Sequence, residues 1–306
     1  MTRNTSPFRP GHRVAALVMV AFVVGLGWGV ARTTAQPGTR VFTGEVGMVI
    51  SHVKAGQATA FERTMTRVGE ALALSEEFDR RRQAVAWKIY KAADPLDGGA
   101  LLYISVLDPV VSGADYWVPQ ILNEAFPTEV QELYDTYAGA FEEEQGQLLM
   151  NLTAVDLGLV AAEPLLGSSF APTSEAAAQP ALGFTGGTGI VLNVVNPAKT
   201  ADFERVMRAF GESLVGSSDA QRQQMWEGLK LYRAAEVGPN NYALYYLLAD
   251  PVVSGGNYAV AQVLADEYMG GPPENGDEVR EIYEAYSGAL EGGGQQTINL
   301  DLVMEF

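Results

Sequence analysis

The stretch DPVVSGADY (Asp108–Tyr116) returns as DPVVSGGNY at Asp250–Tyr258, 142 residues further along the chain. The same offset aligns residues 42–126 with residues 184–268, and about a third of the paired positions are identical. A seven-residue insertion around GGPPENG then shifts the register. Self-similarity at a fixed offset indicates an internal duplication. We therefore expect two copies of one structural unit.

The segment between the two copies has the composition of a linker. Glu163–Leu182 (EPLLGSSFAPTSEAAAQPAL) is rich in Pro, Ser and Ala and shows no sustained apolar period. The predicted domains are therefore residues 41–160 and residues 183–306, joined by a linker over residues 161–182. A flexible coil of this length spans on the order of 25 Å, which allows the two units to pack face to face.

The first 35 residues have the features of a secretory signal peptide. Three arginines precede an 18-residue apolar run, Val14–Ala31, and small residues suitable for cleavage follow at 33–35. The run is close to the minimum length for crossing a bilayer, so an uncleaved membrane anchor is the alternative. Either way, we predict an exported bacterial protein that is periplasmic or secreted.

The composition excludes several classes of protein. The chain has no cysteine, which rules out a disulfide framework. Residues 1–35 hold four arginines and no acidic residue, so the rest of the chain carries a net charge of −21. Nucleic acids and anionic membranes attract clustered Lys and Arg, and we therefore expect neither as a partner, apart from the alternative N-terminal anchor. The composition leaves a homo-oligomer as an open alternative.

Residues that usually bind metals or act as nucleophiles are scarce. Beyond the signal peptide His52 is the single histidine, whereas soft and borderline metals need several His or Cys ligands. Glu142–Glu144 lack the alternating oxygen donors of a calcium loop. The glycines of Gly183–Gly189 precede a strand and open no helix, unlike those of a phosphate-binding loop. We predict no metal, no cofactor and no catalytic residue.

The residue patterns of each copy predict the order β-α-β-β-α-β. β-branched residues indicate strands, and Phe61, Met65, Val68 and Leu72 recur at helical spacing. The expected elements of the first copy are a strand at 47–53, a helix around 61–72, strands at 87–92 and 101–107, a helix at 130–141 and a strand at 149–155. This order is the ferredoxin-like split βαβ motif. One face of such a sheet needs a partner, which the second copy would supply.

Three motifs carry a resemblance to known proteins: Ala86–Lys88 (AWK), the repeated turn at Asp108–Tyr116, and Tyr286–Ala289 (YSGA). With these motifs the chain resembles small secreted bacterial proteins that have no assigned activity. The arrangement is similar to the dimeric α/β-barrel superfamily, in which two ferredoxin-like units pack sheet against sheet. The resemblance implies an α+β fold of two tandem ferredoxin-like units packed as an intrachain pseudo-dimeric α/β barrel.

Alternation along the strands assigns residues to the two faces of each sheet. We expect the helices to cover an apolar set: Met48, Ile50, Trp87, Ile89, Met150, Leu152, Ile190, Leu192, Leu229, Leu231, Ile298 and Leu300. The opposite faces are mixed, and polar groups converging in an apolar hollow are typical of a small-molecule site. The predicted ligand-binding residues are Lys88, Tyr90, Tyr103, Asn151, Lys230, Tyr232, Tyr245 and Asn299. Alternatively, these residues lie at the rim, with their polar ends in water.

The sequence thus predicts an exported, non-catalytic protein of the cell envelope that binds a small organic ligand or a partner protein between its sheets. The first alternative, implied by the superfamily resemblance, is a cofactor-independent monooxygenase-like or heme-related enzyme. The second alternative is a purely structural interaction module. A closed core between the sheets would favour the structural module, and an enclosed polar cavity would favour ligand binding. A cavity beside Tyr, Lys or Asn groups with shifted ionisation would favour an enzyme.

Overall fold

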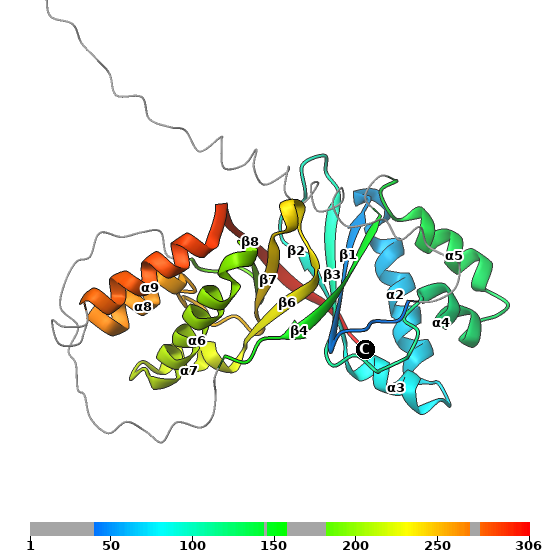
Figure 1. Ribbon diagram of the computed structural model, residues 1–306. Coiled ribbons are helices and arrows are strands. Elements are labelled where there is room, and N and C mark those ends of the chain that lie inside the picture. The colour runs from blue at the N-terminus through cyan, green and yellow to red at the C-terminus, as the bar shows by residue number, and fades with distance from the viewer. Residues whose placement is uncertain (1–39, 144–145, 158–181, 270–275) are drawn as a thin grey trace, which may run out of the picture.

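The computed structural model describes residues 40–143, 146–157, 182–269 and 276–306. Within these ranges, eight antiparallel strands close into a barrel, and helices cover two opposite sides of it (Figure 1). The strands follow one another around the barrel as β1-β3-β2-β8-β5-β7-β6-β4. The predicted signal peptide and nearly all of the predicted linker lie outside the described residues. No helix in the described ranges is long and apolar enough to cross a bilayer.

The two halves of the chain follow the same order of elements. The described elements of the first half are β1 (Val46–Val53), α2 (Ala58–Ala73), α3 (Phe78–Val85), β2 (Trp87–Ala92), β3 (Leu101–Leu107), α4 (Val118–Ala125), α5 (Val130–Gly139) and β4 (Gln147–Ala154). Those of the second half are β5 (Thr188–Val195), α6 (Thr200–Gly216), α7 (Ala220–Glu227), β6 (Leu229–Val237), β7 (Ala243–Ala249), α8 (Val260–Met269), α9 (Gly276–Ala289) and β8 (Leu290–Glu305).

Two pairs of edge strands close the barrel between the halves. β2 pairs with β8, with Lys88 opposite Glu305 and Tyr90 opposite Leu302. β4 pairs with β6, with Ala154 opposite Tyr232. Because every strand of the barrel has two neighbours, no edge is left to pair with another chain. The mixed α/β class and the barrel agree with the predicted fold class, whereas this joining of the sheets edge to edge was not predicted.

Several barrel strands are buried on both faces, which corrects the predicted assignment of those faces. All residues of β1 and β5 are buried. Most of the set expected beneath the helices instead fills the barrel interior, namely Met48, Ile50, Met150, Leu152, Ile190, Leu192, Ile298 and Leu300. Trp87, Ile89, Leu229 and Leu231 do pack against the helices. Alternation fails here because strands covered on both sides have nearly continuous apolar sequences.

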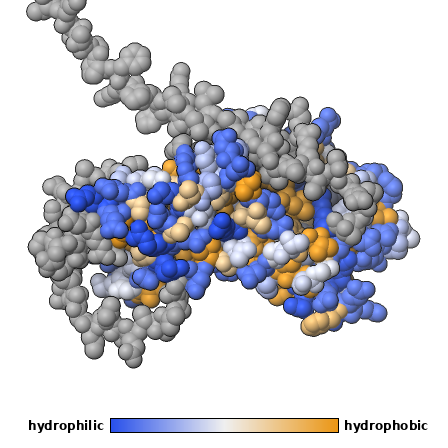
Figure 2. All heavy atoms as spheres, viewed as in Figure 1, coloured by the Kyte–Doolittle hydropathy of each residue, from blue (hydrophilic) through white to orange (hydrophobic). Residues whose placement is uncertain are grey.

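The helices form one layer on each side of the barrel (Figure 1). The predicted helix around 61–72 is confirmed as α2, whose apolar stripe packs against the first-half sheet. The short helices α3 and α7 were not predicted, because their sequences are polar and have no apolar period. Figure 2 shows mainly hydrophilic residues over the helices on the visible face, as expected for an acidic chain.

Candidate functional site

Four of the predicted ligand-binding residues meet at one end of the barrel. Lys88 and Tyr90 come from β2, Lys230 and Tyr232 come from β6, and together they line a cavity of about 110 Å³. Ten of the eleven lining residues form five pairs at the 142-residue offset: Ala86 with Gly228, Lys88 with Lys230, Tyr90 with Tyr232, Val106 with Leu248, and Asp108 with Asp250. Each half of the chain therefore supplies an equivalent set of groups to this barrel-end cavity.

One set of hydrogen bonds converges on Asp250, the residue that follows β7. The Tyr90 hydroxyl donates to Oδ2 of Asp250 at 2.6 Å, and the Lys88 amine donates to the same oxygen at 3.2 Å. Oδ1 accepts a hydrogen bond from the Thr188 hydroxyl at 3.1 Å. This Asp250 cluster, made of Asp250, Lys88, Tyr90 and Thr188, joins β2 of the first half to the second half.

The corresponding set converges on Asp108, the residue that follows β3. The Lys230 amine donates to Oδ2 of Asp108 at 2.7 Å, and the Tyr232 hydroxyl donates to the same oxygen at 2.8 Å. This Asp108 cluster, made of Asp108, Lys230 and Tyr232, joins β6 of the second half to the first half. In one cluster an aspartate of the second half binds side chains of the first half, and in the other an aspartate of the first half binds side chains of the second half.

The protonation of the two clusters follows from their surroundings. Burial, together with the neighbouring Asp250, raises the pKa of Tyr90 well above its ordinary value. Burial and the charge of Asp108 do the same to the pKa of Tyr232. Burial alone would raise the pKa of Asp250, but hydrogen bonds from Tyr90, Lys88 and Thr188 lower it overall. At neutral pH the phenols are therefore neutral hydrogen-bond donors, and Asp250 is a carboxylate.

The two aspartates of this site were missed as candidate functional residues. Asp108 and Asp250 were interpreted only as the ends of strands, where a proline prevents further pairing. A signal was nevertheless available, because both residues open the repeated DPVVSG turn and keep their carboxylates in both copies. An acidic residue that recurs where a strand ends is a candidate for a site at that end of the sheet.

Two predicted site residues, Tyr103 and Tyr245, lie on the helix side of the sheet and do not line the cavity. The Tyr103 hydroxyl donates to Glu62 on α2 at 2.6 Å, and the Tyr245 hydroxyl donates to Glu204 on α6 at 2.5 Å. Each tyrosine ring also packs on a phenylalanine of the same helix. These residues therefore anchor helices to the barrel.

The other two predicted site residues, Asn151 and Asn299, hold the segments that lead into β1 and β5. Oδ1 of Asn151 accepts from the backbone N–H of Thr43 at 2.7 Å, and Nδ2 donates to Glu236 at 2.8 Å. Oδ1 of Asn299 accepts from the backbone N–H of Thr185 at 2.8 Å. Neither asparagine lines the barrel-end cavity.

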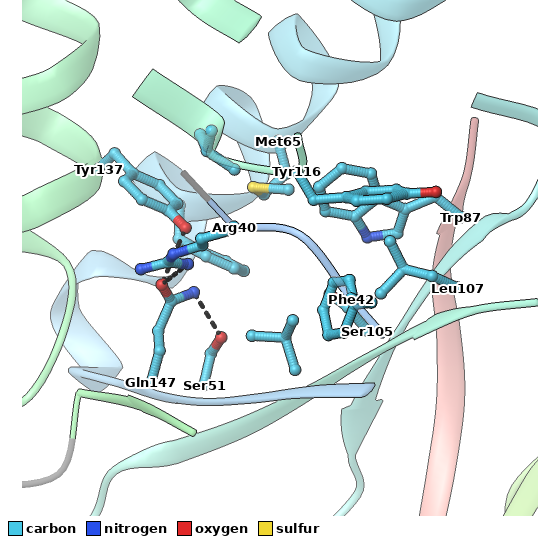
Figure 3. A pocket seen from close by; sticks show the side chains of 13 residues that line it. Arg40, Phe42, Ser51, Met65, Trp87, Ser105, Leu107, Tyr116, Tyr137 and Gln147 are labelled. Carbon is cyan, nitrogen blue, oxygen red and sulfur yellow. Dashed lines mark hydrogen bonds between the residues drawn. The ribbon is translucent and has the colours of Figure 1, made fainter. Parts of the chain in front are cut away.

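A second, smaller cavity lies on the helix side of the first-half sheet (Figure 3). Arg40 and Tyr137 donate to Oε1 of Gln147 at 2.6 and 3.1 Å, and Gln147 donates to the Ser51 hydroxyl at 3.0 Å. The buried Trp87 indole N–H has no partner among the described residues. The cavity measures about 10 Å³, which is room for about one water molecule. No carboxylate lines it, so it offers neither space for an organic substrate nor a base.

Neither a metal nor heme fits the described residues. No group of three or more His, Asp or Glu side chains in the described ranges could hold a metal ion. His52 is 5% exposed within β1 and lies outside the barrel-end cavity. That cavity has no histidine in its lining and is far smaller than a porphyrin.

Several solved structures are similar to this chain. A candidate monooxygenase from Lactobacillus acidophilus NCFM is 9% identical, with a TM-score of 0.40, 85% of this chain covered and 94% of that chain. An anthrone oxidase-like protein is 10% identical, with a TM-score of 0.35 and coverages of 87% and 95%. A heme-binding protein from Thermus thermophilus is 12% identical, with a TM-score of 0.36 and coverages of 86% and 93%. No protein-family model and no curated protein matches the chain.

These comparisons contradict two expectations, the non-catalytic binding role and the interpretation that favours a non-enzyme over an enzyme. The similar structures are named as a monooxygenase candidate, an anthrone oxidase-like protein and a heme-binding protein, and at 9–12% identity these names describe those proteins and not this chain. Since a shared fold does not define a reaction, the chemistry has to come from the residues of this chain.

Proposed function

We propose that this protein is an enzyme that removes a proton from a small phenolic or enolisable molecule in the barrel-end cavity, as the first step of a cofactor-independent oxidation by O₂. The observation that carries this proposal is the pair of carboxylates, Asp108 and Asp250, at one cavity. Each carboxylate is held by a lysine and a tyrosine of the other half. Convergent titratable groups with shifted pKa values are typical of catalytic sites.

The groups of the cavity suit proton abstraction. A carboxylate can accept a proton from carbon or oxygen, and a well-placed general base contributes roughly 10²- to 10⁴-fold in rate. The ammonium groups of Lys88 and Lys230 lie beside the carboxylates and would stabilise the oxyanion that forms. Val106 and Leu248 make the buried part of the lining apolar. Charges act more strongly in such a surrounding than in water.

The size of the cavity limits the substrate. An engineered cavity of about 150 Å³ admits benzene, and the barrel-end cavity is somewhat smaller, at about 110 Å³. The Lys230 side chain at its edge is 60% exposed, so the cavity has a polar, hydrated side. We therefore propose single-ring phenols and small enolisable ketones as substrates.

Oxidation of such a substrate by O₂ needs no further reductant. Loss of a proton leaves an anion, which transfers electrons to O₂. For an activated CH₂ group, the net change converts the CH₂ group and O₂ into a carbonyl group and water, so atoms and electrons balance. The protein binds the substrate, removes the proton and stabilises the anion.

Oxygen uptake by the purified protein, with a chelator present, tests this function. We expect uptake with at least one single-ring phenol or cyclic diketone, and a fall of about 100-fold or more when both Asp108 and Asp250 are changed to Asn. The matched control is Asp94→Asn, which removes an exposed carboxylate from the loop between β2 and β3 and should leave uptake unchanged. The proposal fails if no compound supports uptake, or if the double variant is as active as the parent.

We also propose that the barrel is a pseudo-dimer of two tandem ferredoxin-like units, residues 41–160 and 183–306, joined by the linker 161–182. The common order of elements and the five residue pairs of the cavity support this duplication. Each half alone would leave two strand edges unpaired, and exposed edges promote association. Separately expressed halves should therefore bind each other in size-exclusion chromatography, and their failure to associate would contradict the pseudo-dimer.

Residues 1–35 are proposed to direct export to the periplasm or beyond. Their basic start, apolar run and small residues support a signal peptide. N-terminal sequencing of the protein from its source tests this. A start at or near Gln36 supports cleavage, whereas a retained N-terminus in the membrane fraction would favour the anchor alternative.

A further inference from the structure

The two carboxylates of the barrel-end cavity differ in their hydrogen bonds. Oδ1 of Asp250 accepts a hydrogen bond from the Thr188 hydroxyl at 3.1 Å. The residue that corresponds to Thr188 at the 142-residue offset is Val46, which is buried and has no side-chain donor. Accordingly, Oδ1 of Asp108 accepts no hydrogen bond within the described part of the chain, and only its Oδ2 is engaged.

Resting on the proposed function, we infer that Asp108 is the catalytic base and that Asp250 is a positioning residue, which holds Lys88 and Tyr90 at the substrate. An oxygen without a donor keeps its lone pairs for a substrate hydrogen. A carboxylate that accepts three hydrogen bonds is stabilised as the anion and is therefore a weaker base. The hydrogen bond from Thr188 to Asp250 thus makes Asp108, which belongs to the first half, the carboxylate that removes the proton.

The surroundings of the two clusters agree with this division. Hydrogen bonds outweigh the effect of burial and lower the pKa of Asp250. The Lys230 side chain beside Asp108 is 60% exposed, whereas the Lys88 side chain beside Asp250 is 37% exposed. The lysine of the Asp108 cluster is therefore the more exposed, whereas the two carboxylates are similarly exposed, at 25% for Asp108 and 20% for Asp250. The charged or titratable groups that face the two carboxylates are Lys88, Lys230, Tyr90, Tyr232 and Glu305.

The pH titration of the two carboxyl groups, followed by their ¹³C NMR shifts, tests the inference without any substrate. In the parent protein we expect the pKa of Asp250 to lie below its ordinary value, because Tyr90, Lys88 and Thr188 donate hydrogen bonds to its carboxylate. The reciprocal variants are similar in shape to the residues they replace. Val46→Thr gives Asp108 the missing donor and should lower its midpoint, and Thr188→Val should raise the midpoint of Asp250. The absence of a shift in either midpoint on these exchanges would overturn the inference.

Kinetics of the single variants provide the second readout. Asp108→Asn should lower kcat about 100-fold or more, whereas Asp250→Asn should mainly raise KM and lower kcat less than about 10-fold. Val46→Thr should move the acid limb of the kcat profile to lower pH. Equal losses of kcat, or the larger loss in Asp250→Asn, would overturn the inference and leave the proposed function standing. If both variants keep the parent's full rate of O₂ uptake, the proposed function itself fails.

Discussion

The Tyr90 hydroxyl donates a 2.6 Å hydrogen bond to Oδ2 of Asp250, and this bond connects the two halves of the chain. Tyr90 is 1% exposed, so the bond forms between a buried phenol and a charged acceptor. Charge-assisted hydrogen bonds are roughly twice as strong as neutral ones. Tyr232 and Asp108 make the equivalent connection in the opposite direction. The groups that line the cavity therefore also hold this end of the barrel together.

Removal of one hydroxyl from this connection should destabilise the protein. Tyr90→Phe leaves the half-buried Asp250 without its shortest hydrogen bond, and hydrogen bonds to charged groups contribute about 1.5–3 kcal/mol. We expect a loss of that size in the free energy of unfolding measured with urea. Tyr134→Phe, at a tyrosine that is 43% exposed, is the control and should change it by less than about 0.5 kcal/mol.

A double-mutant cycle separates this bond from other effects of the substitutions. If Tyr90 and Asp250 interact as the structure shows, combining Tyr90→Phe with Asp250→Asn should cost less than the sum of the single changes. Additive losses would contradict a direct interaction. The same cycle for Tyr232 and Asp108 should give a coupling energy of the same sign.

The repeat made much of the fold predictable. The turn at Asp108 and Asp250 marks where β3 and β7 end, and the helical spacing from Phe61 to Leu72 defines α2. The direction in which each strand faces was not predictable, since β1 and β5 are buried at every position and their polar residues do not alternate with apolar ones. A closed barrel beneath two helix layers removes the polar face on which such an assignment depends.

The site was predictable only in part. Lys88 and Tyr90 alternate with Trp87 and Ile89 on β2, so their common face could be read from the sequence. Their partner, Asp250, is 160 residues away from Tyr90 and meets it only because β2 and β8 pair across the halves. Nothing local in the sequence indicates which strand edges join. Contacts that depend on barrel closure therefore needed the structure.

Ionisation of buried tyrosines should unfold the protein at high pH. Burial is the largest cause that raises the pKa of Tyr90, Tyr103, Tyr232, Tyr245, Tyr246 and Tyr286 above the ordinary value of about 10. The unfolded chain releases these protons near pH 10, whereas the folded chain retains them. The stability that they contribute is therefore complete below about pH 10 and is lost as the pH rises further.

Absorbance and circular dichroism together check this alkaline transition. The rise in tyrosinate absorbance of the buried tyrosines should coincide with the loss of the far-UV signal of the barrel. Full ionisation of all tyrosines with an intact barrel would contradict the burial of these phenols.

Substitution of Gly189 should show how closely the segment before β5 packs on the sheet. A Cβ atom at this position would lie 2.2 Å from the Phe184 ring, and one at Gly47 would lie 2.9 Å from the Phe42 ring. Overpacking of a core typically costs about 1–3 kcal/mol, so we expect Gly189→Ala to destabilise more than Gly47→Ala in urea unfolding. Gly56→Ala is the control, because no atom lies within 4 Å of its added carbon. Equal effects at all three positions would contradict this packing.

His52 should make the free energy of unfolding decrease at acidic pH. Its side chain is 5% exposed, and neither ring nitrogen has a hydrogen-bond partner among the described residues. Burial lowers the pKa of His52, and the nearby Gly146 carbonyl and Glu142 carboxylate offset only part of this effect. Below about pH 6.5 the unfolded chain binds a proton at this histidine that the folded chain does not bind. Stability therefore falls as the pH decreases through that range.

The change His52→Val tests this, because valine occupies the corresponding position, Val194, in the second half. Burying an unsatisfied polar group costs about 1–3 kcal/mol, so the variant should be more stable than the parent in urea unfolding at about pH 8. The gain should be larger at about pH 5, because there the unfolded parent binds a proton at His52 and the parent is further destabilised. A variant that is less stable at both pH values would show that the imidazole makes contacts whose contribution exceeds its desolvation cost.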